Sequence, residues 1–350
     1  MKNILVTGGS GFIGTNFIQY ANEIYPDWHI YNIDALTYAG NPLNHRELEM
    51  DPRYTFIHGD ITDADLLKDI FSRHRFEAVF HFAAESHVDR SISGPDIFLN
   101  TNIMGTFRLL EASLNYTRND LKMDFKFIHV STDEVYGSLG FEDSAFTEET
   151  AYDPSSPYSA SKASSDHIVK AYFKTYGLQT IVTTCSNNYG CYQFPEKLIP
   201  LMILNIMDGK KLPVYGKGEN IRDWLYVLDH CEALARIFEK GLAGESYNIG
   251  GGEEKTNIQV VEMICDFMDE KFQKKDSSKN LITFVKDRPG HDIRYAIDCE
   301  KIEKQIGFKA QFSFGQALST TIDWYIGNMD WVRSIQTGEY QQWVQKQYLK

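Results

Sequence analysis

The sequence has no long apolar run and few cysteines. No apolar segment approaches the ~18 residues of a membrane-spanning helix, and the apolar run before Gly8 is too short for the core of a signal peptide. The five cysteines are odd in number and scattered, without a C-x-x-C pair or a histidine at metal-ligand spacing. We therefore expect free thiols, no metal site, no membrane association and a cytoplasmic protein.

Basic residues are also scarce relative to acidic ones. The chain has 35 Lys and Arg against 48 Asp and Glu, a formal charge of -13, which argues against nucleic acid or an anionic membrane as partner. A local cluster of arginines can still bind a small anionic ligand. At 350 residues the chain exceeds the typical length of one domain, so we expect two lobes.

Short apolar runs alternate with longer amphipathic segments in the first half of the chain. This alternation predicts right-handed βαβ crossovers and an α/β fold, a doubly wound parallel Rossmann sheet. The expected strands are 3–9, 29–35, 54–60, 78–85, 125–132 and 179–186. The first lobe is expected to be 1–186, with returning segments about 223–250 and 312–327. A second, smaller α/β lobe is expected to comprise 187–222 and 251–311, followed by a tail, 328–350.

A glycine-rich loop follows the first expected strand. Gly8, Gly11 and Gly14 have G-x-x-G-x-x-G spacing, which lets backbone approach a pyrophosphate at a helix N-terminus. Asp34, at the end of the second strand, can accept adenosine ribose hydroxyls and would repel a 2'-phosphate, which favours NAD over NADP. Asp60 ends the third strand and can meet the adenine amino group. The alternative is a glycine turn in a fold that binds no dinucleotide.

A tyrosine and a lysine lie one helical turn apart later in the chain. Ser155 or Ser156 can cap a helix whose first turn contains Pro157, and Tyr158 and Lys162 are then i and i+4 on one face. A nearby ammonium lowers the pKa of a phenol, and a phenolate beside a nicotinamide can take the proton of an alcohol as its hydride leaves. A tyrosine and a lysine at this spacing also occur by chance, so the catalytic interpretation depends on the glycine loop as well.

Two adjacent carboxylates follow the fifth expected strand. Asp133 and Glu134, after Thr132, are either a solvated turn or an acid and a base, because a carboxyl desolvated beside another carboxylate can retain its proton. Successive strand residues point to opposite sides. Both can therefore face one substrate only if the chain leaves strand geometry at or just after Thr132.

These features together resemble the extended short-chain dehydrogenase/reductase family. A longer, ordered set of segments is similar to its nucleotide-sugar 4,6-dehydratases over essentially the whole chain: FAAESHVDRS, STDEVYG, PYSASKASSDH, SNNYG, FPEKLIP, IRDWLYV and DRPGHD. The resemblance implies an NAD-dependent lyase that oxidises dTDP-glucose at carbon 4, eliminates water across carbons 5 and 6 and returns hydride to carbon 6. The product would be dTDP-4-keto-6-deoxyglucose, a precursor of 6-deoxysugars such as rhamnose. UDP-glucose as substrate and nucleotide-sugar 4-epimerisation are the alternatives.

The resemblance also implies roles for particular residues. Tyr158, helped by Lys162 and Thr132, would be the base at carbon 4, Glu134 the base at carbon 5, and Asp133 the acid at the carbon 6 hydroxyl. The implied cofactor contacts are Gly8, Gly11, Phe12, Ile13, Gly14, Asp34, Thr37, Asp60, Ile61, Ala83, Thr101, Tyr158, Lys162 and Asn188. The implied substrate contacts are Ser86, Thr132, Asn187, Lys197, Leu198, Pro213, Val214, Tyr215, Arg222, Asn257, Asp287, Arg288 and His291.

Three further expectations follow. Arg222 and Arg288 can clasp phosphate oxygens bidentately. The resemblance implies a homodimer formed through paired helices of the first lobe. Cys191 stands where relatives usually have proline, which makes the loop less rigid, so we expect alkylation of this thiol to slow turnover and bound nucleotide to protect it.

Overall fold

The computed structural model describes residues 1–118, 124–287 and 290–336. Seven strands form its central sheet: β1 (Lys2–Thr7), β2 (Trp28–Asp34), β3 (Tyr54–His58), β4 (Ala78–His81), β5 (Lys126–Thr132), β6 (Thr180–Cys185) and β10 (Ser246–Ile249). Every neighbouring pair is parallel, and the order is β10-β6-β5-β4-β1-β2-β3. The predicted Rossmann sheet is confirmed.

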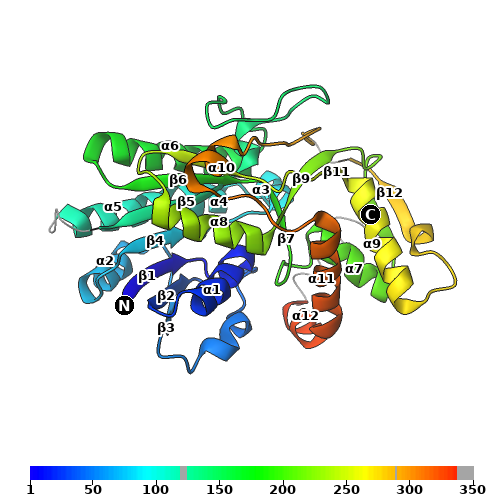
Figure 1. The fold of residues 1–350 in the computed structure, drawn as a ribbon, viewed down its shortest axis with the longest axis horizontal. Coiled ribbons are helices and arrows are strands. Elements are labelled where there is room, and N and C mark those ends of the chain that lie inside the picture. The colour runs from blue at the N-terminus through cyan, green and yellow to red at the C-terminus, as the bar shows by residue number, and fades with distance from the viewer. Residues whose placement is uncertain (119–123, 288–289, 337–350) are drawn as a thin grey trace.

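Helices cover both faces of this sheet (Figure 1). One layer contains α1 (Phe12–Ile24) and α8 (Val227–Lys240), and the other α2 (Ala64–Arg73), α5 (Thr106–Arg118) and α6 (Pro157–Tyr176). Strand residues alternate between the two cores, as the period of two requires. Ile4 and Val6 pack with α1 and α8, whereas Leu5 packs with α2 and α5. Both faces are therefore apolar, as in a buried parallel sheet.

The strand order reverses beside β1. The chain proceeds from β1 to β2 and β3 on one side, and then to β4, β5 and β6 on the other. Open parallel sheets bind ligands beyond the carboxyl ends of the strands at such a switch point. The fold thus places a ligand crevice between the ends of β1 and β4.

A smaller group of elements lies beside the central sheet (Figure 1). It has a three-stranded sheet of β7 (Asn187–Tyr189), β9 (Ile221–Tyr226) and β11 (Glu254–Thr256), and a parallel pair, β8 (Leu212–Tyr215) with β12 (Ile282–Val285). The helices beside these sheets are α7 (Leu198–Met207), α9 (Asn257–Phe272), α11 (Phe314–Gly327) and α12 (Met329–Ile335).

Two parts of the expected division of the chain differ from the observed packing. The segment expected to return to the first lobe at 312–327 forms α11, which packs against α7 and α9 of the smaller group. β9, at the start of the expected return at 223–250, pairs with β7 and β11, whereas β10 joins the central sheet. The apolar face of α11 could pack against either lobe, so the sequence alone does not predict which lobe the helix joins.

Shorter elements connect these layers. They are η1 (Pro42–Leu48), α3 (Val88–Ser93), α4 (Asp96–Phe98), η2 (Leu99–Gly105), η3 (Asp133–Tyr136), η4 (Ser278–Leu281) and α10 (Glu300–Ile306). In the part of the chain that the structure describes, no helix is both long and apolar enough to cross a membrane.

Candidate active site

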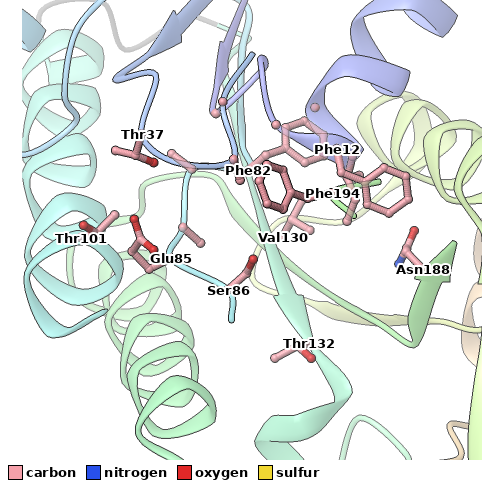
Figure 2. A pocket seen from close by; sticks show the side chains of 18 of the residues that line it. Phe12, Thr37, Phe82, Glu85, Ser86, Thr101, Val130, Thr132, Asn188 and Phe194 are labelled. Carbon is pink, nitrogen blue, oxygen red and sulfur yellow. The ribbon is translucent and has the colours of Figure 1, made fainter. Parts of the chain in front are cut away.

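A cavity extends along the carboxyl ends of β1, β2, β4, β5 and β6. Every residue predicted to contact the cofactor lines it, and so does every predicted catalytic residue. Figure 2 shows Phe12, Phe82 and Phe194 at one part of the wall and Thr132 at another, with Val130 between them. The fold therefore gathers side chains from well-separated segments around one space.

The glycine loop has the shape that a dinucleotide requires. Gly8 has φ 71°, and a Cβ there would lie 2.6 Å from the backbone of Ala83. A Cβ at Gly14 would lie 2.4 Å from the carbonyl oxygen of Gly8, whereas one at Gly11 would meet only that same oxygen at 3.4 Å. α1 begins after Gly11 with no side-chain cap, so its first N–H groups point toward the cavity. This cradle fits a pyrophosphate.

The acidic residue that ends β2 is held in place by backbone donors. Asp34 Oδ2 accepts a hydrogen bond from Ser10 N at 2.9 Å, and Oδ1 accepts one from Leu36 N at 2.7 Å. Burial raises the pKa of Asp34, although both hydrogen bonds oppose the shift. Asp60, which is exposed, accepts hydrogen bonds through Oδ1 from the backbone N and the Oγ1 of Thr62, each at 2.8 Å. Both carboxylates line the same cavity as the glycine loop.

The chain leaves strand geometry directly after Thr132. Its φ of −136° and ψ of 148° end β5, and its Oγ1 accepts a hydrogen bond from Glu134 N at 3.3 Å, which caps η3. Gly137 has φ 93° and ends η3, and a Cβ there would lie 2.6 Å from the carbonyl oxygen of Asp153. The capped turn resolves the geometric difficulty posed by the sequence, because Asp133 and Glu134 both line the cavity.

The two carboxyl groups have different surroundings. Asp133 is 2% exposed; its Oδ1 accepts a hydrogen bond from Thr132 Oγ1 at 3.3 Å, and Oδ2 has no hydrogen-bond partner among the described residues. Burial raises the pKa of Asp133 well above its ordinary value, and the charges of Glu134 and Asp223 raise it further, against the opposing charge of Arg222. Burial thus favours the protonated form of Asp133, while Glu134 is half-buried at the cavity wall.

α6 brings Tyr158 and Lys162 to the cavity. Of the two expected caps, Ser155 and Ser156, the structure has Ser156, which also forms a capping box with Ser159. Burial raises the pKa of Tyr158 well above 10.0, Glu134 adds to the rise, and a hydrogen bond from Thr132 opposes it. The lowering of the Tyr158 pKa by Lys162 stays a prediction, because burial is the largest influence on this phenol in the protein alone. Lys162 donates to the carbonyl of Val130 at 2.8 Å, and burial lowers its pKa to about 8.

The predicted substrate residues fall into two groups. Those that line the cavity are Ser86, Thr132, Asn187 and Lys197. Lys197 Nζ donates to the carbonyl of Ser86 at 3.3 Å, which joins two of the predicted segments. The described residues outside the cavity lining are Leu198, Pro213, Val214, Tyr215, Arg222, Asn257, Asp287 and His291.

The second group includes a small cluster in the smaller lobe. His291 Nδ1 lies 2.6 Å from Asp287 Oδ1, and the His291 ring centroid is 6.1 Å from that of Tyr215. Arg222 is buried, donates to the carbonyl oxygens of Ile221 and Asp292 at 2.7 and 3.0 Å, and lies over the ring of Tyr295. Arg288 lies outside the described residues. The two-arginine phosphate clamp therefore stays a prediction.

Several cavity residues were not identified from the sequence. Glu85 and Glu196 are both buried at the wall, and Tyr38 Oη donates to Glu196 Oε1 at 3.1 Å. Burial raises the pKa of Glu196, while the nearby charges of Lys197 and Arg90 lower it. Glu85 and Glu196 occur in two of the segments that carry the resemblance, FAAESHVDRS and FPEKLIP. Their residue types alone gave no signal of burial.

Known proteins are similar to this chain over nearly its whole length. Residues 5–321 match the family model described as GDP-mannose 4,6 dehydratase. A dTDP-glucose 4,6-dehydratase of Shigella flexneri is 54% identical, and the match covers 99% of this chain and 98% of that protein.

Two crystal structures are also close to this fold. The dTDP-glucose 4,6-dehydratase of Bacillus anthracis in complex with NAD is 46% identical with a TM-score of 0.86, covering 96% of this chain and 100% of that one. The dTDP-glucose 4,6-dehydratase of Streptomyces venezuelae, with NAD and TYD bound, is 44% identical with a TM-score of 0.88, covering 95% and 99%. The similarity includes both the central sheet and the smaller group of elements.

Proposed function

The chain belongs to the nucleotide-sugar 4,6-dehydratase family, and from this premise we propose that it converts dTDP-glucose to dTDP-4-keto-6-deoxyglucose with NAD as cofactor. It is a hydro-lyase. The observation that carries the proposal is the pair of carboxyl groups on η3: Asp133 and Glu134 line one cavity, and burial raises the pKa of Asp133 well above its ordinary value. Elimination of water needs an acid and a base at adjacent carbons, which such a pair supplies.

The first step is oxidation at carbon 4 of the glucose. Bound NAD supplies the hydride acceptor and later returns the hydride to carbon 6. We assign Tyr158 as the base that takes the hydroxyl proton, with the hydroxyl of Thr132 hydrogen-bonded to its phenol. Because burial keeps Tyr158 protonated in the protein alone, positive charge must lower its pKa in the complex. Lys162, on the same face of α6, is the residue placed to supply that charge, and an oxidised nicotinamide would add to it when bound.

The second step is elimination. A ketone at carbon 4 acidifies the hydrogen at carbon 5, and we assign Glu134 as the base that removes it. Asp133 gives its proton to the hydroxyl leaving carbon 6, so that one water departs and a double bond forms between carbons 5 and 6. Hydride then adds to carbon 6 and a proton to carbon 5. Glu134, protonated in the elimination, is the group placed to return that proton.

The alternatives explain less of this site. A 4-epimerase shares the glycine loop, Tyr158 and Lys162, yet performs no elimination and has no use for a buried protonated Asp133. UDP-glucose differs from dTDP-glucose by one methyl group on the base and one hydroxyl on the ribose. A pocket that fits the methyl group favours one nucleotide over the other by only about 1–3 kcal/mol. The relatives named above favour the thymidine nucleotide.

We also propose a cytoplasmic homodimer. All five cysteines are free thiols, which suits a reducing compartment. Ile97, Leu99 and Met104 are 51%, 47% and 42% exposed on α4 and η2, ahead of α5. A second copy of the chain would cover this apolar surface. Light scattering behind size-exclusion chromatography should give twice the chain mass, and a monomer at micromolar concentration would contradict the dimer.

A single assay tests the proposed function. The purified protein is incubated with dTDP-glucose, and in a parallel reaction with UDP-glucose, and the mass of each product is measured by mass spectrometry. We expect a product lighter by one water and a higher kcat/KM for dTDP-glucose. An unchanged mass with an inverted carbon 4 would identify an epimerase, and no conversion of either sugar would contradict an enzymatic role.

A further inference from the structure

Asp166 is a buried carboxylate that has no part in the steps above. It lies on α6, four residues beyond Lys162 and eight beyond Tyr158, so the three side chains share one helix face. Asp166 is 0% exposed and is not among the residues that line the cavity. A fully buried charge is costly unless it is paired and hydrogen-bonded. Its partners therefore indicate what it does.

Two hydrogen-bond donors from outside α6 hold one oxygen of the carboxylate, and a histidine lies beside the other oxygen. Ser131 Oγ donates to Asp166 Oδ2 at 2.8 Å, and Tyr152 Oη donates to the same oxygen at 3.0 Å. His129 Nε2 lies 3.2 Å from Oδ1. Ser131 and His129 belong to β5, next to Thr132 and to Val130, whose carbonyl accepts from Lys162. The carboxylate thus fixes α6 against the strand that carries the catalytic turn.

The groups around the Lys162–Asp166 pair are mostly neutral at neutral pH. Those whose pKa is coupled to the pair are His81 on β4, His129 on β5, Tyr136 on η3, Tyr152 before α6, Cys185 on β6 and Lys170 on α6. Burial lowers the pKa of His129 to about 4 and raises that of Cys185 to about 12, so neither carries charge there.

Lys162 consequently depends on Asp166 for a counter-charge. Burial alone would raise the pKa of Asp166, but His129, Lys162 and Ser131 together hold it below its ordinary value, so Asp166 is ionised. Burial lowers the pKa of Lys162, and the carboxylate of Asp166 is the strongest opposing influence. Lys170, one turn further along, donates to Tyr152 Oη at 3.1 Å and is a second cation near the same carboxylate.

We propose that Asp166 is a positioning residue of this active site: its buried carboxylate, hydrogen-bonded to Ser131 of β5, is the counter-charge for Lys162 one turn earlier on α6 and docks that turn against β5. A charged ammonium at Lys162 favours release of the proton of Tyr158. Asp166 therefore sets the upper pH limit of the oxidation step. This role rests on the proposed function, because it acts through Tyr158 and Lys162.

The test is the substitution Asp166→Asn, which keeps the size and hydrogen-bonding capacity of the side chain but removes its charge. We expect the basic limb of the kcat profile to move to lower pH by about one unit, so that kcat near pH 8 falls about fivefold while KM for dTDP-glucose and bound NAD change little. Asp166→Glu, which keeps the charge, should retain the wild-type limb. Ser165→Ala is the control: Ser165 is equally buried on α6 but donates to the carbonyls of Asn102 and Ser161.

A loss of kcat of equal size at every pH would overturn the proposal, since a structural defect in α6 has that effect. A direct titration separates this from failure of the proposed function. With 13C-labelled lysine, the Lys162 resonance, assigned through Lys162→Met, should titrate at lower pH in Asp166→Asn than in the wild type, whatever sugar the enzyme uses. If Asp166→Asn does not fold, the 13C carboxyl resonance of Asp166 in the wild type must respond as Lys162 deprotonates. A flat response would overturn the proposal.

Discussion

Thr132 Oγ1 accepts a hydrogen bond from the backbone N of Glu134 at 3.3 Å, and this contact converts the end of β5 into the first turn of η3. Residues of a 3₁₀ turn are spaced about 120° apart around the axis, instead of alternating between opposite faces. Asp133 and Glu134 can therefore approach the same sugar from adjacent positions. The division of labour between an acid and a base depends on this turn.

Replacing Asp133→Asn should stabilise the fold, increasingly so as the pH rises. Asp133 has a folded-state pKa well above the 3.8 of the unfolded chain, so between these values the folded protein binds a proton that the unfolded chain has released. Wild-type stability therefore falls with pH above the unfolded value, by about 1 kcal/mol per pH unit from this group, and the variant lacks that loss.

Urea unfolding of wild type and Asp133→Asn at several pH values from about 5 to 8 measures the difference. The exposed carboxyl variant Asp27→Asn serves as the control and should show no such trend. A stability difference that does not grow with pH would mean that Asp133 is ionised in the folded protein.

Tyr158→Phe should lose oxidation at carbon 4 while retaining substrate and cofactor. The substitution removes only the phenol oxygen from a buried ring, so we expect kcat to fall by about 10²-fold or more, the usual contribution of a general base. Single-turnover absorbance of the reduced nicotinamide measures the step. Formation of reduced nicotinamide at the wild-type rate would show that another group takes the proton.

Gly8→Ala should destabilise the fold and empty the cofactor site. At φ 71° a Cβ is strained by about 1–2 kcal/mol, and here it would also lie 2.6 Å from the Ala83 backbone. Gly307→Ala is a matched control, because Gly307 has φ 73° and nothing lies within 4 Å of the added Cβ. Chemical unfolding and the NAD content of the purified proteins should separate them. Equal loss in both variants would contradict a steric role for Gly8.

Alkylation of Cys191 should be slow, and the expected effect of complete alkylation on turnover stays a prediction. Burial raises the pKa of this thiol to about 12, and the thiolate is the reactive species, so little of it forms near neutral pH. Labelling should quicken as pH rises toward that value. Intact-mass measurement with iodoacetamide follows the labelling, and Cys191→Ala is the control for activity. Rapid labelling of Cys191 near neutral pH would contradict a thiol whose pKa is raised by burial.

The sequence predicted the features that depend on local patterns. The six expected strands, the glycine loop and the cap at Ser156 follow from apolar runs, glycine spacing and serine before proline, and the structure has each of them. The sequence predicts that Asp133 and Glu134 can face one substrate only if the chain leaves strand geometry at or just after Thr132. The cap of η3 by Thr132 fulfils this requirement.

Features set by distant packing were not predictable in this way. The pKa of Asp133 is raised partly by Asp223, from another strand 90 residues later, and Arg222 is held by the carbonyl of Asp292, 70 residues away. The partners of Asp166 likewise come from β5 and from Tyr152. No spacing rule connects such residues, because the fold alone brings them together.

The central claim is that Glu134 removes the proton at carbon 5 while Asp133 protonates the leaving hydroxyl. Deuterium incorporation at carbon 5 during single turnovers of dTDP-glucose in D₂O tests it most directly, in Asp133→Asn and Glu134→Gln side by side. We predict that Asp133→Asn still exchanges the carbon 5 hydrogen but releases no water, and that Glu134→Gln exchanges none. Exchange in Glu134→Gln as fast as in Asp133→Asn would contradict the assignment of Glu134 as the base at carbon 5.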